Sequence, residues 1–299
     1  MDAHFCKTGT IEKLVNSIEQ PFVYSARECD RLEAYVRDVI NLGSVGCYQH
    51  HSIDRTLLRT KYFFGERYTY GAQMSEKRLG LERLYPSNLI EPIPLWIYLY
   101  IINPLISANV IEANFVNSAV INEYLPGGCI VSHIDPPHIF DRPIISISLF
   151  SDCAMCFGCK FEYKPIRCSE PILRLPLPRG VVTLLSGFAA NEITHCIRPE
   201  DTTFYRAVIL LRRVLPNAPR LSHLSTLLDA NNVNLVAASK FKLDNDKTTE
   251  GVLKKFCDKY SKVRKGKRGN YGGIMKVHTR KTYFADNKQY ANKAYSISE

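Results

Sequence analysis

The most constraining feature of the sequence is a succession of short strand-like segments that contains no helix between residues 116 and 213. The segments are rich in β-branched and aromatic residues, and turn residues such as Pro126-Gly127-Gly128 separate them. The eight expected strands are 116–125, 129–134, 144–150, 158–163, 171–175, 181–185, 193–197 and 206–213. Eight short strands in a row are typical of a jelly roll, and the expected absence of crossover helices argues against a parallel α/β sheet.

The segments before this region add helices to the β core. A capping-box pattern that begins at Ser25 predicts a helix over residues 25–42. Residues 61–64 predict a further strand, and the apolar run 94–111 predicts a helix that Pro104 kinks or ends. We therefore expect a mainly β protein with flanking helices, of the α+β class.

The expected strands carry a candidate metal site. His133 and Asp135 are two residues apart on one strand, so their side chains point to the same face and can bind one ion, and His195 lies on a later strand. Two histidines and one carboxylate are the ligand set of many non-haem iron sites, which leave three positions for a co-substrate and oxygen. A His-x-Asp pair also arises by chance on an ordinary strand. Arg206, which follows the third ligand, is a candidate to bind the far carboxylate of a dicarboxylate co-substrate.

Other polar residues near these positions give weaker signals. Asn122 and Tyr124 share one strand face, which an ordinary polar strand face also explains. Lys61 and Tyr68 lie in an aromatic segment that suits either edge packing or stacking on a nucleic-acid base. Arg212 is a weaker candidate for ordering the site, because arginine is usually a surface residue.

The cysteines allow more than one interpretation. Cys153, Cys156 and Cys159 form a CxxCxxC pattern, and Cys168 follows nearby. Four cysteines could hold zinc, but this spacing matches none of the usual paired zinc motifs. Ten cysteines in 299 residues suit a protein of a reducing compartment.

The positive charge of the chain is concentrated at one end. The formal net charge is +10, and residues 240–299 carry 16 Lys and Arg against 6 Asp and Glu. The whole excess therefore lies in this segment, which includes the basic cluster 262–268. Such a distribution indicates a basic arm on a neutral domain and favours an anionic partner, although a solubilising tail or a nuclear address has the same composition.

The sequence suggests neither secretion nor membrane insertion. The first residues lack the basic start and apolar run of a signal peptide, and the most apolar stretch, 95–102, is far shorter than the roughly 20 residues that a membrane span needs. We expect a soluble protein inside the cell.

Long stretches resemble the AlkB family of iron(II)- and 2-oxoglutarate-dependent dioxygenases, over about residues 22–215. The resemblance rests on the run 122–152 (NEYLPGGCIVSHIDPPHIFDRPIISISLFSD) and on CFGCKFEYKPIR, LSGFAANEITHCIRPED and RAVILLRR. The upstream segment RTKYFFGE followed by YTYG is also similar. Within the family the chain is most similar to the branch called AlkB homologue five, which removes the methyl group of N6-methyladenine in RNA.

The resemblance implies a fold and a reaction. The fold is the double-stranded β-helix, or jelly roll, of the dioxygenases, with an N-terminal helix and a nucleotide-recognition lid. The cofactors are Fe(II), 2-oxoglutarate and O2. The products are formaldehyde, succinate and CO2, and the partner is single-stranded RNA that carries N6-methyladenine.

The resemblance also assigns roles to residues. His133, Asp135 and His195 match the iron ligands. Co-substrate binding falls to Asn122, Tyr124, His133, His195 and Arg206. Recognition of the target nucleotide falls to Lys61 and Tyr68, and Cys159 and Cys196 match a cysteine pair that forms a disulfide in the RNA-demethylating branch.

The expected organisation is a dioxygenase domain at residues 1–215 and a basic, disordered tail at 216–299. We expect a monomer in the nucleus, or otherwise in the cytoplasm. Two alternatives stay open: an inactive RNA-binding module on a dioxygenase scaffold, and an AlkB-type enzyme that acts on alkylated DNA or on protein.

Overall fold

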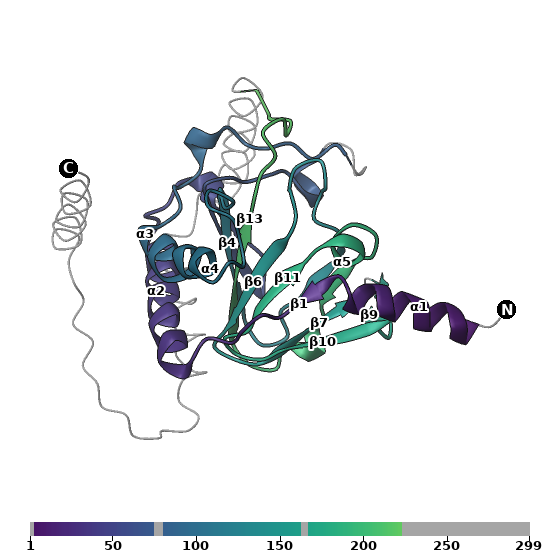
Figure 1. Ribbon diagram of the computed structural model, residues 1–299. Helices are drawn as coiled ribbons and strands as arrows, with labels where there is room; N and C mark the ends of the chain where they lie inside the picture. Colours follow the sequence, from purple (N-terminus) through teal and green to yellow (C-terminus); the bar gives the residue numbers. More distant parts are fainter. Residues whose placement is uncertain (1–2, 75–79, 163–166, 223–299) are drawn as a thin grey trace, which may run out of the picture. The chain divides into compact units, whose positions relative to one another are not determined.

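The computed structural model describes residues 3–74, 80–162 and 167–222 (Figure 1). These residues belong to one compact unit, and a second unit, Val233–Glu299, lies wholly outside them. Within the described ranges, no helix has both the length and the apolar character that crossing a bilayer requires.

Seven antiparallel strands form the larger of two packed sheets. In spatial order they are β1 (Ile18–Glu19), β11 (Val182–Leu185), β6 (Ile144–Leu149), β13 (Arg206–Arg212), β4 (Ser118–Tyr124), β3 (Arg59–Phe64) and β2 (Ile53–Arg55). The central strand β13 pairs with β6 on one side and β4 on the other. Neighbours in space are mostly distant in sequence, as a jelly roll requires.

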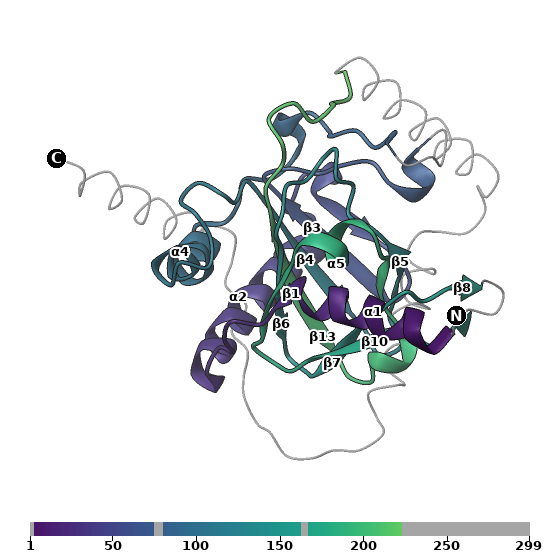
Figure 2. The same cartoon turned by 45° about the vertical axis from the view of Figure 1, so that its right-hand side comes forward.

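Four antiparallel strands form the smaller sheet. Their spatial order is β10 (Leu173–Leu177), β7 (Cys153–Phe157), β12 (His195–Ile197) and β5 (Ile130–His133). A separate two-stranded hairpin, β8 (Phe161–Glu162) and β9 (Arg167–Cys168), lies beside this sheet (Figure 2). The mainly β, jelly-roll fold predicted from the sequence is confirmed.

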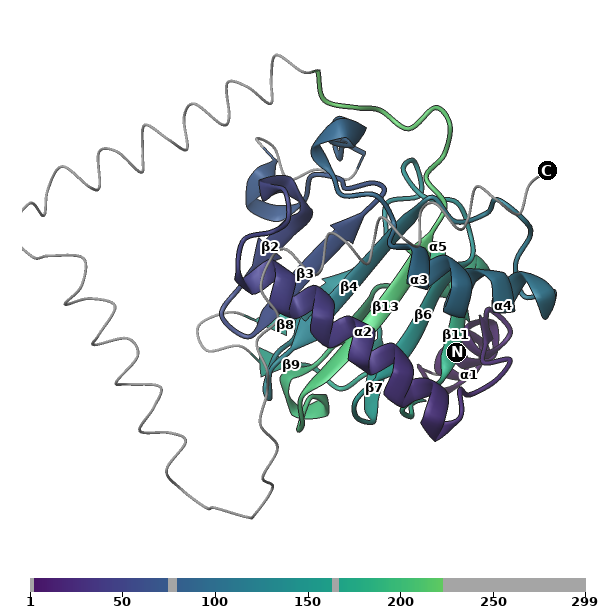
Figure 3. The same ribbon diagram turned by 90° about the vertical axis from the view of Figure 1, so that its left-hand side faces the viewer.

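Helical segments cover the outside of the strands. The longer ones are α1 (Ala3–Val15) and α2 (Ala26–Ser44). The shorter ones are α3 (Leu95–Ile97), the π-helical turn η4 (Tyr98–Ile102), α4 (Asn103–Ser107), α5 (Gly187–Asn191), and the 3-10 turns η1 (His50–Ser52), η2 (Gly71–Gln73), η3 (Ser87–Leu89) and η5 (Pro199–Asp201). Figure 3 shows α2 crossing one face of the larger sheet, with α3 and α4 beside it.

Alternation along the strands of the larger sheet creates two different faces. On the outer face, buried apolar residues pack with α2 and the α3–α4 run; they include Tyr62, Ile121, Ile147 and Ile209 from the sheet and Leu32 and Val36 from α2. The inner face looks toward the smaller sheet, because side chains at successive strand positions point in opposite directions. A second apolar cluster, which includes Met155, Phe157 and Ile197, packs between the sheets. The outer face therefore stabilises the fold, and the inner face is available for chemistry.

One predicted strand was wrong. The expected strand 158–163 is replaced by β7, which ends at Phe157, and by β8, which covers only two residues of the separate hairpin. All five residues of β7 are buried, so the strand lacks the polar–apolar alternation of a half-exposed strand. Gly158, with a φ of +73°, ends the strand directly after it.

Pro104 does not end the helix, which was one of the two predicted effects, and the predicted kink remains a prediction. Helical backbone continues from Leu95 to Ser107, and Pro104 lies in the first turn of α4. The π-helical turn η4 comes immediately before it. A π-turn adds one residue to the helical ladder, which fits a chain that must accommodate the missing N–H of proline without stopping.

The predicted tail lies outside the described residues from residue 223 onward, so the domain boundary at 215, the disorder and the nuclear location remain predictions. The described chain continues to pack beyond Leu215. The Leu221 N–H donates to the Leu84 carbonyl at 2.8 Å, and Arg220 pairs with Glu66 at 2.6 Å. A truncated protein that removes the tail should therefore end after Ser222.

The predicted helix 25–42 is confirmed as α2, and its cap gives a test of local stability. Ser25 accepts from the Glu28 N–H, and the Glu28 carboxylate accepts from the Ser25 N–H at 2.8 Å. Ser25→Ala should destabilise the fold by about 1 kcal/mol, or lower Tm by about 2–4 °C, because it leaves a helix N–H without its acceptor. Glu28→Gln is the matched control, since an amide oxygen still accepts. Thermal unfolding measures both variants, and an unchanged Tm in Ser25→Ala would contradict the role of the cap.

Candidate functional site

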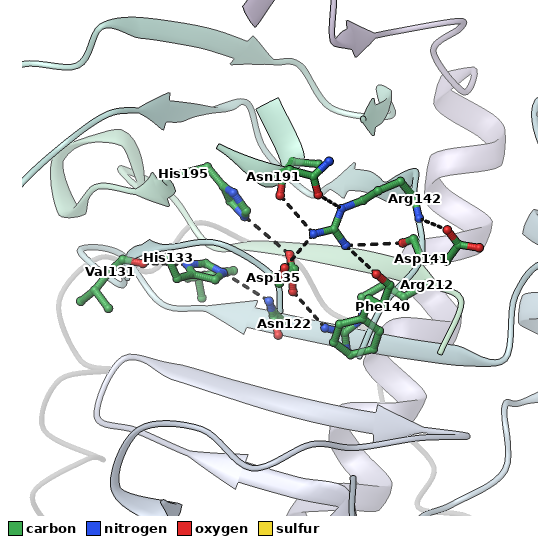
Figure 4. Close-up of polar contacts among 12 residues, drawn as sticks. Asn122, Val131, His133, Asp135, Phe140, Asp141, Arg142, Asn191, His195 and Arg212 are labelled. Atoms are coloured by element: carbon green, nitrogen blue, oxygen red, sulfur yellow. Dashed lines mark hydrogen bonds and ion pairs between the residues drawn. The ribbon is translucent and has the colours of Figure 1, made fainter. Parts of the chain in front are cut away.

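The three predicted metal ligands converge at one edge of the smaller sheet. His133 on β5 lies directly opposite His195 on β12, and their ring centroids are 4.5 Å apart. Asp135 follows β5, with one carboxylate oxygen 3.7 Å from Nε2 of His195. One ligand atom from each residue lies within 4.8 Å of the other two, as the close-up in Figure 4 illustrates. Strand pairing thus assembles three residues that the sequence separates.

Both histidines are held in the neutral form that binds a metal. His133 Nδ1 lies 2.8 Å from the Val131 carbonyl, which can only accept a hydrogen bond, so Nδ1 carries the proton and Nε2 keeps its lone pair. Burial, and secondarily the cations Lys61 and Arg59, lower the pKa of His133. Burial together with the neighbouring His133 lowers the pKa of His195 to about 3.

The third ligand is held as an anion. Burial alone would raise the pKa of Asp135, but Arg212 and the two histidines lower it to about 2. Arg212 Nη1 lies 3.3 Å from the Asp135 carboxylate and is itself buried. The structure therefore places Arg212 inside the site instead of on the surface. Two neutral imidazoles and one carboxylate on converging atoms fit a divalent transition-metal ion such as iron.

The inner face of the larger sheet supplies the opposite wall of the site. His133, Asp135 and His195 line a cavity whose empty volume is about 740 Å³ when its open mouth is included. Among the residues that line it from the larger sheet are Lys61, Asn122, Tyr124, Arg206 and Arg212. In the sheet Lys61 pairs with Asn122, and Tyr124 pairs with Arg206, so these side chains lie in adjacent rows on one face.

Arg206 is built to receive an anion. It is only 1% exposed, and its Nη2 donates to the Ser148 hydroxyl at 3.2 Å. Its Nε and Nη1 have no hydrogen-bond partner among the described residues, and the same holds for Oδ1 of Asn122. Unpaired buried guanidinium nitrogens are costly, and a carboxylate can satisfy two of them at once. The residues present therefore fit a dicarboxylate that reaches from the metal ligands to Arg206.

Lys61 and Tyr68 lie in the same cavity. Lys61 Nζ lies 4.3 Å from the ring centroid of Tyr70, and burial together with Arg59 and Arg212 lowers its pKa to about 7. Tyr68 packs against Tyr70 and edge-on against Phe140. A lysine near half protonation and a buried phenol thus stand beside the metal ligands, where either can bond a ligand that enters the cavity.

One residue of the site was missed by the sequence analysis. Arg142 donates to the Asp135 carbonyl at 2.7 Å, to the Ala190 carbonyl at 3.1 Å and to Oδ1 of Asn191 at 2.9 Å (Figure 4). It therefore ties the segment that carries the carboxylate ligand to α5, which precedes His195. Its partners are mostly backbone carbonyls from distant segments, so no local sequence pattern identifies it.

The cysteines split into separate environments. Cys159 and Cys196 come close to each other and are free thiols, so the predicted disulfide remains a prediction. Cys153 packs in the core between the sheets, and the thiol of Cys156 donates to Asp201 at 3.4 Å. The CxxCxxC pattern therefore does not form one metal site.

The lowered pKa of Lys61 gives a test on the ligand-free protein. Between about pH 7 and pH 10, Lys61 is protonated in the unfolded chain and neutral in the folded chain. The free energy of unfolding therefore rises with pH in this window and falls as the pH is lowered toward 7. In Lys61→Met the rise in stability over this window should be smaller, by up to about 1.4 kcal/mol per pH unit. Denaturant unfolding at several pH values measures it. The exposed Lys160→Met is the control, and equal pH slopes in all three proteins would contradict the burial argument.

Comparison with known proteins agrees with this geometry. The 2OG-Fe(II) oxygenase superfamily matches residues 50–236. The protein "RNA demethylase ALKBH5" of Rattus norvegicus is 56% identical over 72% of this chain and 54% of its own length. "RNA demethylase ALKBH9B" of Arabidopsis thaliana is 34% identical over 36% of this chain and 21% of its own.

The chain spans about half the length of the ALKBH5 relatives that it matches. The solved structure of OsALKBH1 aligns with 66% of this chain and 95% of its own, at 13% identity and a TM-score of 0.40, which is too low to add to the assignment. The superfamily match includes every metal ligand and Arg206. By this match and by the site that it contains, the chain belongs to the 2OG-Fe(II) oxygenase superfamily.

Proposed function

We propose that this chain is an Fe(II)- and 2-oxoglutarate-dependent dioxygenase that removes the methyl group of N6-methyladenine in single-stranded RNA. One observation carries the proposal: the His133, Asp135 and His195 ligand atoms and the unpaired nitrogens of Arg206 face one cavity. The 56% identity to an RNA demethylase supports the substrate class.

The division of labour follows from the cavity. When bound, iron, 2-oxoglutarate and O2 would supply the oxidising chemistry: one oxygen atom of O2 goes to the methyl carbon and the other to succinate, and CO2 is released. His133, Asp135 and His195 would hold the iron, and Arg206 would hold the far carboxylate of 2-oxoglutarate through its guanidinium fork. Arg212 would keep the Asp135 carboxylate ionised. After hydroxylation, the hydroxymethyl group on the base would break down and release formaldehyde.

Lys61 and Tyr68 would position the methylated base. They line the same cavity as the metal ligands, at 8% and 7% exposure, so a base can reach them only after it leaves its stack. The Tyr68 phenol can donate a hydrogen bond to a ring nitrogen, because burial raises its pKa and keeps it protonated. This requirement favours single strands over a duplex.

Arg206 tests the co-substrate assignment. Arg206→Ala should raise the Kd of 2-oxoglutarate roughly ten- to more than one-hundred-fold, since a hydrogen bond to a charged group is worth about 1.5–3 kcal/mol. Arg206→Lys keeps the positive charge but loses the planar guanidinium. Its Kd for 2-oxoglutarate should therefore lie between that of the unsubstituted protein and that of Arg206→Ala. Calorimetric titration with Mn²⁺ in place of iron measures the affinity without turnover. Unchanged 2-oxoglutarate affinity in Arg206→Ala would remove this residue from the site.

Tyr68 tests the substrate assignment. Tyr68→Phe keeps the ring and removes one hydroxyl, so demethylation of a short methylated RNA should fall about five-fold, the value of one hydrogen bond of about 1 kcal/mol. The affinities for metal and 2-oxoglutarate should not change, because Tyr68 is not among the ligands. Demethylation equal to that of the unsubstituted protein would leave the phenol without an orienting role.

One experiment distinguishes the proposed RNA demethylase from an enzyme that acts on DNA or protein and from an inactive RNA-binding module. Mass spectrometry of methylated RNA, methylated DNA and methylated peptide after incubation with iron and 2-oxoglutarate identifies the substrate, and succinate release reports turnover. An inactive RNA-binding module predicts no loss of the methyl group and no succinate. The proposal takes the enzyme as a monomer, and sedimentation analysis tests this.

A further inference from the structure

Three thiols meet behind the cavity that the proposed reaction uses, which Cys196 also lines. Cys159 follows β7, Cys168 belongs to β9, and Cys196 belongs to β12. Each sulfur lies within 4.8 Å of the other two. Because side chains alternate along a strand, Cys196 faces away from its neighbour His195, and it packs with Cys156 and Cys159 in a cluster of its own.

Two neighbouring cysteines, Cys153 and Cys156, do not join this group of three thiols. Cys156 lies opposite Cys196 in the sheet, but its thiol donates to Asp201, a carboxylate that Arg198 also binds at 2.6 Å. Cys153 faces the core between the sheets. The thiols free to converge, within the described ranges, are therefore those of Cys159, Cys168 and Cys196.

We propose that these three cysteines form a second metal site, distinct from the iron site, that takes a thiophilic ion such as Zn²⁺ or Cu⁺. Sulfurs bound at about 2.3 Å to a common ion lie about 3.8–4.0 Å apart, so the observed spacing needs only a contraction of about 1 Å or less. A disulfide between Cys159 and Cys196 would exclude the ion, so the site belongs to the reduced protein, in which these cysteines are free thiols. Thiolates select these ions over iron and magnesium.

The surroundings suit an ion that exchanges with solvent. Cys159 and Cys196 are buried, whereas Cys168 is partly exposed and leaves the cluster accessible from the β8–β9 side. Zn²⁺ can complete a tetrahedron with water on this side, and Cu⁺ can remain three-coordinate. Binding replaces the thiol protons, which pass to solvent.

The site spans the strands that carry both histidine ligands. Cys196 directly follows His195, and Ser132, which directly precedes His133, donates through its hydroxyl to the Cys159 carbonyl at 2.7 Å. An ion that joins the three sulfurs would therefore fasten β12 to the end of β7 and to the hairpin. Metal occupancy would add rigidity behind the iron site without contributing an atom to it.

Metal titration of the reduced full chain tests the proposal. Because the iron site also binds divalent ions, Co²⁺ serves as the probe: sulfur ligands give an intense near-ultraviolet charge-transfer band that histidine and carboxylate ligands do not give. Cys168→Ser should abolish this band and weaken Zn²⁺ or Cu⁺ affinity at least about ten-fold, since even groups outside the coordination shell are worth 10–100-fold. Competition with chromogenic chelators measures the two ions separately in His133→Ala, whose iron site is lost, and tight binding of either ion that Cys168→Ser weakens supports the site.

Matched variants separate this site from its neighbours. Cys156→Ser and the exposed Cys47→Ser should keep the band, and His133→Ala should keep it even though the iron site is lost. Failure of the proposed demethylation would therefore leave this result untouched. Absence of the band in the reduced protein, or a band that survives Cys168→Ser, would overturn the proposal.

Discussion

The burial of two arginines on one central strand is the constraint on which the site depends. Arg206 and Arg212 lie at the two ends of β13, and both are almost completely buried between the sheets. Removing a guanidinium from water costs several kcal/mol unless anions or acceptors surround it. Arg212 has an anionic partner within the chain, because its Nη1 pairs with Asp135, while its Nε and Nη2 have no hydrogen-bond partner among the described residues. Arg206 has only the neutral Ser148 hydroxyl, and its Nε and Nη1 have no hydrogen-bond partner among the described residues, so an anion that enters the cavity would offset the cost of burying it.

The charges around the metal ligands follow from the same burial. Depressed pKa values keep His133 and His195 neutral, because nothing anionic except Asp135 offsets their desolvation. Arg212 keeps Asp135 ionised despite its burial. The site therefore presents two lone pairs and one negative charge near neutral pH, and a divalent ion can bind without first displacing protons.

The sequence predicted the site better than it predicted the connections around it. Strand alternation and spacing were enough to place His133, Asp135 and Arg206, because His133 and Arg206 lie on strands and Asp135 follows His133 by two residues. The strand over Cys153–Phe157 was missed because all its residues are buried and its cysteines suggested metal chemistry. Arg142 could not be found, since its partners are backbone carbonyls, and Arg212 was undervalued because arginine is usually exposed.

The register of the larger sheet decides which residues share the cavity. Lys61 pairs with Asn122, which pairs with Val208, and Tyr124 pairs with Arg206 on the same face. The residues between them, such as Tyr62 and Ile121, point outward into the core with α2. A slip of one residue between β3 and β4 would turn Lys61 out of the cavity and bury an outer-face residue in its place. The apolar packing of α2 against the outer face therefore also keeps Lys61, Asn122, Tyr124 and Arg206 on the cavity side of the sheet, although α2 contributes no residue to the cavity lining.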